Sequence, residues 1–303
     1  MTRPRRARLD AELVRRGLAR SREHAGRLIA EGRVSVGGQT ATKAATQVET
    51  GAALLVAEDA GDPGYVSRGG HKLAGALRAF SDEYRRLTQD PAAPAAPAAP
   101  EALGARRETA ARPAGGLRIA GRRALDAGAS TGGFTDVLLR AGAAHVVAVD
   151  VGYGQLAWSL RADDRVTVRD RTNVRELTLE HVGGEPVDLV VGDLSFIPLG
   201  LVLPALARCA APDADLVLMV KPQFEVGRER LGSGGVVRSP ELRAEAVRTV
   251  ARRAAELGLG VLGVTASPLP GPSGNVEYFL WMRAGAPDLD PADVDRAVAE
   301  GPR

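Results

Sequence analysis

Lysine and cysteine are scarce in this sequence, and each scarcity narrows what the protein can be. Of its 40 basic residues only three are lysines: Lys43, Lys72 and Lys221. The single cysteine, Cys209, excludes an internal disulfide bond and, with only four histidines, leads us to expect no metal site. Cys209 falls in a predicted helix, where we expect a small core residue rather than a nucleophile. This cysteine usage indicates a reducing, cytoplasmic location.

Long apolar runs are missing as well. The longest are about the length of a strand, well short of the ~18 apolar residues that a membrane span needs. The basic start of the chain, MTRPRRARLD, is not followed by an apolar stretch with a cleavage site, so we expect no secretory signal. With 45% hydrophobic residues, the 303-residue chain can still bury a sizeable core in two domains. We therefore expect a soluble protein with no membrane partner.

Positive charge gathers near the start of the chain. Residues 1–50 contain 11 Lys or Arg against 5 Asp or Glu, whereas the whole chain carries a net charge of only +3. A small basic front on a mildly acidic body suggests a module that binds a polyanion, joined to a second domain. The alternative is a solvated basic arm that binds nothing.

Residues 8–57 have the pattern of a compact α+β unit. RLDAELVRRGLA predicts a helix that closes near Gly17, and Ser21 can cap a second helix that ends at Gly32. RVSVGGQTATK predicts a strand, a turn and more strand. The pattern resembles the RNA-binding module named for small-subunit ribosomal protein four, which implies phosphate contacts with structured RNA rather than sequence readout. The residues that we expect to contact RNA are Arg8, Arg20, Ser21, Arg22, Lys43 and Arg68.

The rest of the chain alternates strands with helices from Arg123 onward. Near-continuous Val/Leu strands between helices predict a parallel sheet covered on both faces. The last two strands are joined by a Pro/Gly/Ser loop without a helix, so we expect them to pair as an antiparallel hairpin at one end. The predicted organisation is an RNA-binding domain at 1–62, a connecting segment and helix at 63–85, a low-complexity Pro/Ala insertion at 86–118, a catalytic domain at 119–285 and a flexible tail at 286–303.

A glycine-rich loop, LDAGASTGGF, follows the first predicted strand of the catalytic domain and opens a helix. Its spacing is not G-x-G-x-x-G, and Asp126 at the strand end would repel a pyrophosphate but attract a cationic amino acid moiety. Asp150 ends the second strand, where it can bind ribose hydroxyls, and Asp170 ends the third, near an adenine. Each aspartate alone could be a strand-end cap. Together they resemble the way S-adenosylmethionine is held in the seven-stranded methyltransferase fold, which implies a cofactor site formed by Asp126, Gly128, Ser130, Thr131, Gly132, Gly133, Phe134, Asp150, Asp170 and Asp193.

Four ionisable residues stand in unusual places. Lys72 lies on a predicted helix, Asp193 ends the fourth strand, Lys221 ends the fifth in VKPQFE, and Glu277 lies inside the last strand between apolar neighbours. Lys72 could be a surface helix residue, Asp193 a cap, and Glu277 a residue on the solvent face of an edge strand. A purely structural role is harder to assign to Lys221, because a charged residue at the end of a buried strand lies at the edge of the sheet where ligands bind.

These four positions match a known catalytic set. The catalytic half resembles the FtsJ-like ribose 2′-O-methyltransferases, whose Lys-Asp-Lys-Glu tetrad falls on Lys72, Asp193, Lys221 and Glu277. Over nearly its full length, through SRGGHKL, LDAGASTGGFTDVLL, VKPQFEVG and LPGPSGNVEYFLW, the chain resembles the TlyA-type rRNA cytidine 2′-O-methyltransferases, also called haemolysins. The Pro/Ala insertion departs from that family. The resemblance implies an α/β, seven-stranded Rossmann-like methyltransferase fold with a small N-terminal α+β RNA-binding domain.

The implied chemistry explains why lysine is kept at these positions. A ribose 2′-hydroxyl is a weak nucleophile that must be aligned with the methyl–sulfonium bond and must lose a proton. A lysine amine can accept that proton only if its pKa falls from ~10.4 towards neutrality, whereas arginine cannot lose its proton in a protein. We expect Lys221 to be the principal base or hydroxyl activator and Lys72 to orient the ribose, although the two roles could be exchanged. Asp193 and Glu277 would hold the lysines.

The predicted function is therefore S-adenosylmethionine-dependent 2′-O-methylation of cytidine in ribosomal RNA, of the 16S kind, the 23S kind or both. The expected partners are ribosomal RNA and ribosomal subunits, with no obligatory protein partner. Two alternatives remain. One is a membrane-active haemolysin, for which the sequence offers no apolar span. The other is a non-catalytic RNA-binding assembly factor, which would not need the tetrad.

Overall fold

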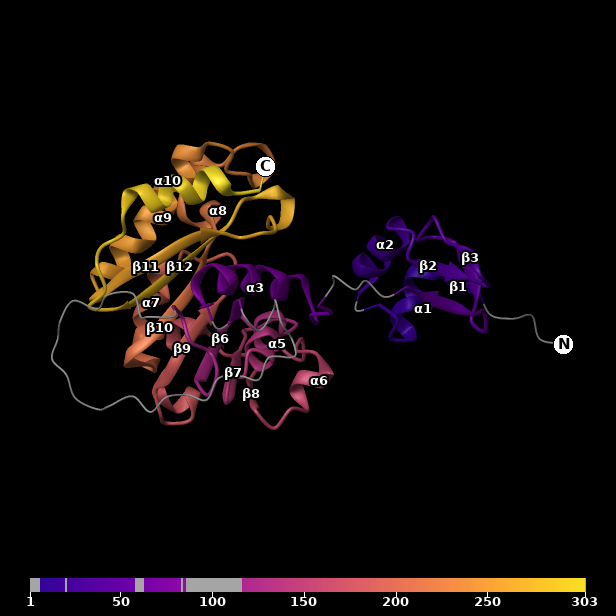
Figure 1. Ribbon diagram of the computed structural model, residues 1–303, viewed down its shortest axis with the longest axis horizontal. Coiled ribbons are helices and arrows are strands. Elements are labelled where there is room, and N and C mark those ends of the chain that lie inside the picture. Colours follow the sequence, from indigo (N-terminus) through magenta and orange to yellow (C-terminus); the bar gives the residue numbers. More distant parts are fainter. Residues whose placement is uncertain (1–5, 20, 58–62, 83, 86–115, 303) are drawn as a thin grey trace. The chain divides into compact units, whose positions relative to one another are not determined.

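The computed structural model describes residues 6–19, 21–57, 63–82, 84–85 and 116–302 (Figure 1). The chain divides into two compact units, Met1–Val66 and Ser67–Arg303. Of the predicted Pro/Ala insertion, residues 86–115 lie outside the described residues.

The N-terminal unit packs two helices over short antiparallel strands. Ser21 caps the second helix by accepting a hydrogen bond from the His24 backbone N–H at 3.1 Å, as the sequence predicts. One pair of strands, β1 with β4, is a feature that the sequence did not reveal, because three-residue strands carry almost no pattern. A small apolar core that includes Leu13, Leu28 and Val34 holds the unit together. The elements are β1 Arg6–Arg8, α1 Leu9–Arg15, α2 Arg22–Ala30, β2 Val34–Val36, β3 Gln39–Thr40, β4 Gln47–Glu49 and β5 Leu54–Val56.

The second unit is built on one seven-stranded sheet. Its strand order is β11-β12-β10-β9-β6-β7-β8, and the five strands from β10 to β8 run parallel (Figure 1). The predicted antiparallel hairpin of the last two strands is confirmed, with β12 inserted between β10 and β11. The strands are β6 Arg123–Ala127, β7 His145–Val149, β8 Val166–Arg169, β9 Val187–Gly192, β10 Ala210–Val220, β11 Leu259–Ala266 and β12 Tyr278–Ala284.

Helices cover both faces of this sheet, as its continuous apolar strands require. On one face α3 contacts β11 and α5 contacts β6 and β7, while α7 and α9 pack on β10 on the other face. Cys209 is buried at the end of α7, as predicted. The helices are α3 Arg68–Phe80, α5 Gly133–Arg140, α6 Trp158–Arg161, α7 Leu203–Cys209, α8 Pro222–Glu225, α9 Pro240–Ala255 and α10 Pro291–Glu300.

Helix α3 precedes the sheet in the chain and is held at both ends, by β12 at its end and by α5 at its start. The ring of Phe80 lies 5.7 Å from that of Trp281 on β12. At its start α3 meets the first turn of α5 so closely that a Cβ atom on Gly133 would lie 2.3 Å from Ser67 Oγ and 2.7 Å from the Gly70 nitrogen. Gly133, which the sequence assigned to cofactor approach, therefore permits the contact between two helices that positions Lys72.

The C-terminal segment differs from the flexible tail that the sequence predicted. Residues Pro291–Glu300 form α10, which packs on α9 and β11 with Val294 and Ala297 buried. Asp290 caps it by accepting a hydrogen bond from the Ala292 backbone N–H at 2.9 Å. Only two of its ten residues are buried, so the apolar pattern is weak. The acidic composition of the segment therefore suggested a flexible tail instead of a packed helix.

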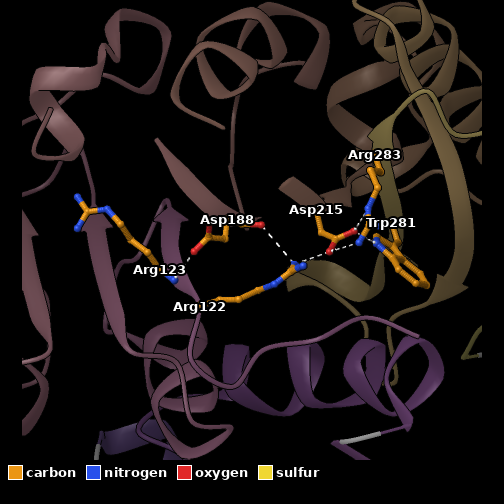
Figure 2. A network of polar contacts seen from close by, with 6 residues as sticks. All are labelled: Arg122, Arg123, Asp188, Asp215, Trp281 and Arg283. Atoms are coloured by element: carbon orange, nitrogen blue, oxygen red, sulfur yellow. Dashed lines mark hydrogen bonds and ion pairs between the residues drawn. The ribbon is translucent and has the colours of Figure 1, made fainter. Parts of the chain in front are cut away.

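A buried carboxylate on β10 joins this strand to β12 and to the residue before β6. Asp215 on β10 is fully buried and accepts hydrogen bonds from Trp281 Nε1 at 2.7 Å, Arg283 Nε at 2.9 Å and Arg122 Nη1 at 2.5 Å, as Figure 2 shows. Arg122 also donates to the Asp188 carbonyl at 3.3 Å. The network satisfies a charge that would otherwise be costly to bury. It lies towards the edge of the sheet where the parallel strand β6 begins, opposite the edge that carries the tetrad.

Replacing Trp281 with phenylalanine is expected to lower the free energy of unfolding by about 1–3 kcal/mol. An aromatic ring is retained, but the smaller side chain leaves unfilled volume in the core, and one hydrogen bond to a buried carboxylate is lost. Denaturant unfolding checks this, and methyl transfer should be unchanged at a temperature where the variant is folded. An unfolding curve superimposable on that of the wild type would contradict the structural role of this hydrogen bond.

Candidate active site

Two ion pairs are formed by the four residues of the predicted tetrad. Lys72 Nζ lies 2.5 Å from Glu277 Oε2, and Lys221 Nζ lies 2.6 Å from Asp193 Oδ1. Three of the side chains are almost fully buried, with 7% of Lys72, 7% of Lys221 and none of Glu277 exposed, whereas 23% of Asp193 is exposed. Lys72 is therefore no surface helix residue and Glu277 does not face solvent. Both lysines are neutralised by a carboxylate that they contact directly.

The sheet register explains why residues far apart in the sequence meet. Asp193 follows Gly192, which pairs with Leu218 in the parallel β9–β10 ladder, so it ends its strand close to Lys221. Val220 pairs with Tyr278 in the antiparallel β10–β12 ladder, and Lys221 and Glu277 are the next residues outward. The strand β12 thus begins after Glu277 rather than including it. Lys72 comes from α3, which packs on one face of the sheet, and its side chain reaches Glu277 at the same edge.

The segment after β9 runs beside Lys221. Ser195 Oγ accepts a hydrogen bond from Lys221 Nζ at 2.8 Å. At the other end of the segment, the Leu199 backbone N–H donates to Glu225 Oε1 at 2.8 Å. Burial raises the pKa of Glu225 to about 7, while this hydrogen bond opposes the rise. Lys221, which precedes α8, and Glu225, at its end, thus hold the two ends of the segment from Ser195 to Leu199.

A cavity of about 440 Å³ opens at the carboxyl edge of β6, β7 and β9. That volume lies within the range of small-ligand sites. Its lining combines carboxylates with apolar side chains, which suits a ligand that has a polar part and an aromatic part. The lining residues are Gly128, Ser130, Asp150, Val151, Gln155, Asn173, Val174, Asp193, Leu194, Ser195, Phe196, Ile197 and Val202.

Four of the predicted cofactor residues line this cavity: Gly128, Ser130, Asp150 and Asp193. Gly128 has φ +84°, and a Cβ there would lie 2.8 Å from the Asp193 carbonyl oxygen, so no other residue fits without displacing the end of β9. The Asp150 carboxylate accepts hydrogen bonds from the backbone N–H groups of Ser130 at 2.8 Å and Gly152 at 2.7 Å. These bonds fix the carboxylate at the cavity wall with lone pairs to spare.

Asp126 and Asp170, two further predicted cofactor residues, do not line this cavity. Asp126 is fully buried and accepts hydrogen bonds from the backbone N–H and the hydroxyl of Thr135 at 2.9 and 2.7 Å, which ties α5 to β6. Burial raises the pKa of Asp126 to about 7. Asp170 pairs with Arg161 at 2.8 Å, and that hydrogen bond lowers its pKa. Neither carboxylate lines the cavity, because a partner that the sequence pattern did not reveal engages each of them.

The remaining residues of the predicted loop serve packing. Gly132 has φ +95°, and a Cβ on it would lie 2.3 Å from Leu160 Cδ1 of α6. The ring of Phe134 lies 6.0 Å from that of Phe279 in the core, and Thr131 accepts the Ala157 backbone N–H through its carbonyl. These residues shape the loop rather than form the cavity wall.

Sequence reasoning missed several cavity residues. Gln155, Asn173, Ser195, Phe196 and Ile197 line it from the segments after β7, β8 and β9. The one available signal was their position, since each follows a predicted strand end. Phe196 is 91% exposed with φ +65°, a backbone conformation that non-glycine residues rarely adopt.

The predicted RNA contacts fall into three groups. Arg8 and Arg22 lie together on the N-terminal unit, where both contact Asp10. Lys43 is exposed in the turn before β4, while the Ser21 hydroxyl is used as a helix cap. Arg68 belongs to the second unit and donates to the Pro270 carbonyl at 3.3 Å. The remaining residue, Arg20, lies outside the described residues.

Comparison with known families matches two parts of the chain. Residues 109–284 match the model of the FtsJ-like methyltransferase family, and residues 7–54 match that of the S4 domain. The first match covers more than half of the chain and contains three residues of the tetrad. Lys72 lies before it, on the helix that the structure docks onto the catalytic sheet.

Individual relatives extend the similarity to nearly the whole length. The chain is 56% identical to the 16S/23S rRNA (cytidine-2′-O)-methyltransferase TlyA of Mycobacterium tuberculosis, over 98% of this chain and 99% of that protein. It is 30% identical to Hemolysin A of Brachyspira hyodysenteriae, over 90% and 98%. A solved structure from Streptococcus thermophilus, named as a candidate haemolysin, is 33% identical with a TM-score of 0.68 and covers 99% of this chain and 96% of that chain. The chain belongs to the FtsJ-like methyltransferase family, in the TlyA branch that carries an S4 domain at its N-terminal end.

Proposed function

We propose that this protein methylates the ribose 2′-hydroxyl of cytidine in ribosomal RNA, with S-adenosylmethionine as the methyl donor. The observation that carries the proposal is the pair of buried lysine–carboxylate contacts, Lys72–Glu277 and Lys221–Asp193, of which Asp193 lines the cavity. A protein that only binds RNA needs no such arrangement. The 56% identity to an rRNA (cytidine-2′-O)-methyltransferase supports the choice of substrate, and the 16S and 23S rRNAs are both candidates.

The cavity fits S-adenosylmethionine. Asp150 offers a fixed carboxylate for the ribose hydroxyls, Leu194, Ile197 and Val174 offer apolar surface for the adenine, and Asp193 offers negative charge for the cationic part. When bound, this cofactor supplies an electrophilic methyl group on a sulfonium. The chain must then hold the ribose hydroxyl in line with that group and remove its proton.

The tetrad divides that work. Lys221, at the end of β10 and in contact with Asp193 on the cavity wall, activates the hydroxyl or accepts its proton. Lys72, held by Glu277, orients the ribose from the side of α3. Positioning of this kind with acid–base help contributes about 10²–10⁴ in rate. The S4 domain contributes affinity through phosphate contacts, so binding should weaken steeply with salt.

The proposal is tested by methyl transfer from radiolabelled S-adenosylmethionine to purified small and large ribosomal subunits and to deproteinised 16S and 23S rRNA. We expect label in RNA, in a dinucleotide that resists alkaline hydrolysis because the 2′-hydroxyl is blocked. Label on a base, or in none of the four substrates, would overturn the proposal. Mapping the blocked position then identifies the nucleotide.

Replacing Asp150 with alanine is expected to weaken S-adenosylmethionine binding about 10- to 100-fold, because a charge-assisted hydrogen bond contributes about 1.5–3 kcal/mol. Isothermal titration calorimetry without RNA measures this directly. The matched control is Asp170→Ala, which removes a strand-end carboxylate of the same type that does not line the cavity. Equal losses in both variants would contradict the assignment of Asp150 to the ribose.

Membrane activity is a second candidate function to test, because one relative is named Hemolysin A. Among the residues that the structure describes, no helix is both long and apolar enough to cross a bilayer. Leakage of dye from liposomes, with and without S-adenosylmethionine, separates the two activities. Leakage that persists in the Lys221→Ala variant would support a second, independent function.

A further inference from the structure

The first helix of the N-terminal unit buries two acids in a basic surface. Asp10 and Glu12 of α1 are 4% and 1% exposed, and each contacts two arginines. A buried carboxylate is costly unless it is paired, so these contacts are built into the fold.

Asp10 joins arginines from two different elements. Arg8, at the end of β1, donates from Nε to Asp10 Oδ1 at 3.0 Å and from Nη2 to Oδ2 at 2.8 Å, a bidentate pair. Arg22, the first residue of α2, donates from Nη2 to Oδ2 at 3.0 Å. The Ala11 backbone N–H completes the set at 2.8 Å. These donors hold the pKa of Asp10 far below its usual range, so the carboxylate stays charged.

The two guanidinium groups are only partly used by this contact. The side chains of Arg8 and Arg22 are 44% and 59% exposed, and each guanidinium has five N–H donors. The Arg8–Arg22–Asp10 cluster keeps one net positive charge and presents unused donors of both arginines to solvent. A free arginine side chain loses rotamer entropy when it is fixed, and here that ordering precedes any ligand.

The Glu12–Arg16 contact shows what a purely structural pair looks like, whereas the side chain of Arg15, the other partner of Glu12, is 60% exposed. Arg16 also donates to the carbonyls of Ala52 at 2.7 Å and Thr50 at 2.8 Å, and only 23% of the Arg16 side chain is exposed. The Arg16 guanidinium therefore donates its hydrogen bonds to groups within the N-terminal unit. The arginines on Asp10 make no such backbone contacts among the described hydrogen bonds, which leaves their remaining donors open to an anion.

We propose that Asp10 is a positioning residue for RNA binding: it holds Arg8 and Arg22 as one preformed fork for backbone phosphates of structured RNA. The inference rests on the proposed function, because it gives the S4 domain of that enzyme its phosphate-binding geometry. It has an unusual consequence. A negative charge in the middle of the RNA-binding surface strengthens binding.

Replacing Asp10 with asparagine in the full-length protein tests this, because charge alone and geometry predict opposite signs. Removal of a negative charge should tighten RNA binding by simple electrostatics. We expect the affinity for deproteinised 16S or 23S rRNA to fall about tenfold instead, since two arginines lose their fixed orientation. The KM for RNA should rise while kcat at saturating RNA stays the same. The matched control is Glu49→Gln, which removes an exposed acid near Arg6 and should leave binding equal or tighter.

Two further variants separate positioning from general support of the fold. In an Arg8→Gln/Arg22→Gln background, Asp10→Asn should cause no further loss, because it acts through those two residues. The Arg8→Lys/Arg22→Lys protein keeps Asp10 and the charge but loses the fork, so it should also bind about tenfold more weakly. It keeps the inference testable if Asp10→Asn fails to fold.

Three results would overturn the inference: Asp10→Asn binding as tightly as Glu49→Gln in a folded protein, a further loss in the Gln background, or wild-type affinity in the double lysine variant. Failure of the proposed function would look different. In that case the wild-type protein itself would not methylate rRNA, whatever the relative RNA affinities of the variants.

Discussion

Replacing Lys221 with alanine is expected to lower kcat for rRNA methylation by about 10²–10⁴ while leaving the affinity for S-adenosylmethionine within a few-fold of the wild type. Lys221 Nζ contacts Asp193 and Ser195 at the cavity wall, but the lysine itself does not line the cavity. It should therefore affect the reaction more than cofactor binding. Single-turnover methyl transfer and calorimetry measure the two effects separately.

The Lys221→Arg variant sharpens the same prediction. Arginine keeps the positive charge and could still hold a hydroxyl oxygen, but it cannot release a proton in a protein. If Lys221 accepts the proton of the 2′-hydroxyl, the arginine variant should be as inactive as the alanine variant. Retention of more than about a tenth of the wild-type kcat would show that the residue acts as a fixed cation instead. Arg253→Ala, an exposed substitution on α9, controls for general effects.

The sequence was sufficient to bring Asp193 and Lys221 together, because both follow parallel strands and the carboxyl ends of parallel strands meet at one edge. Lys72 and Glu277 were added to them by the family resemblance. The same strand-end rule predicted Asp126 and Asp170 as cofactor residues, which stays a prediction, although neither lines the cavity. Position at a strand end does not reveal whether a carboxylate faces the ligand or is engaged by a neighbour, and here Thr135 and Arg161 engage them.

Other features were hidden for related reasons. The strands β1 and β4 have three residues each, which is too short for an alternation of apolar and polar residues to be recognised. The contact of Asp10 with Arg22 depends on how the helices α1 and α2 pack, which no local pattern encodes. The tight meeting of α3 with α5 depends on Gly133, whose place in a glycine-rich loop suggested a ligand instead.

The second large effect is expected from breaking the Lys72–Glu277 pair. The Lys72→Met variant leaves Glu277, which is fully buried, without the ammonium that it contacts at 2.5 Å. Removing one partner of a buried ion pair lowers the free energy of unfolding by about 3–5 kcal/mol. Trp281 is also fully buried and belongs to the same unit, so its fluorescence in denaturant reports on this unfolding, best in a Trp158→Phe background.

Two companion variants turn that loss into a test of why the pair exists. In Lys72→Met/Glu277→Leu both charges are gone, and an apolar pair of similar volume should restore stability to about the wild-type value or above it. Methyl transfer should nevertheless stay lost, since the ribose has no ammonium to orient it. The exposed pair Arg253–Glu256 is the matched control, and its removal should cost less than about 1 kcal/mol. A restored fold with restored activity would mean that Lys72 and Glu277 only support the structure. A restored fold without activity would mean that the protein retains a buried charge pair, at a cost in stability, for the reaction itself.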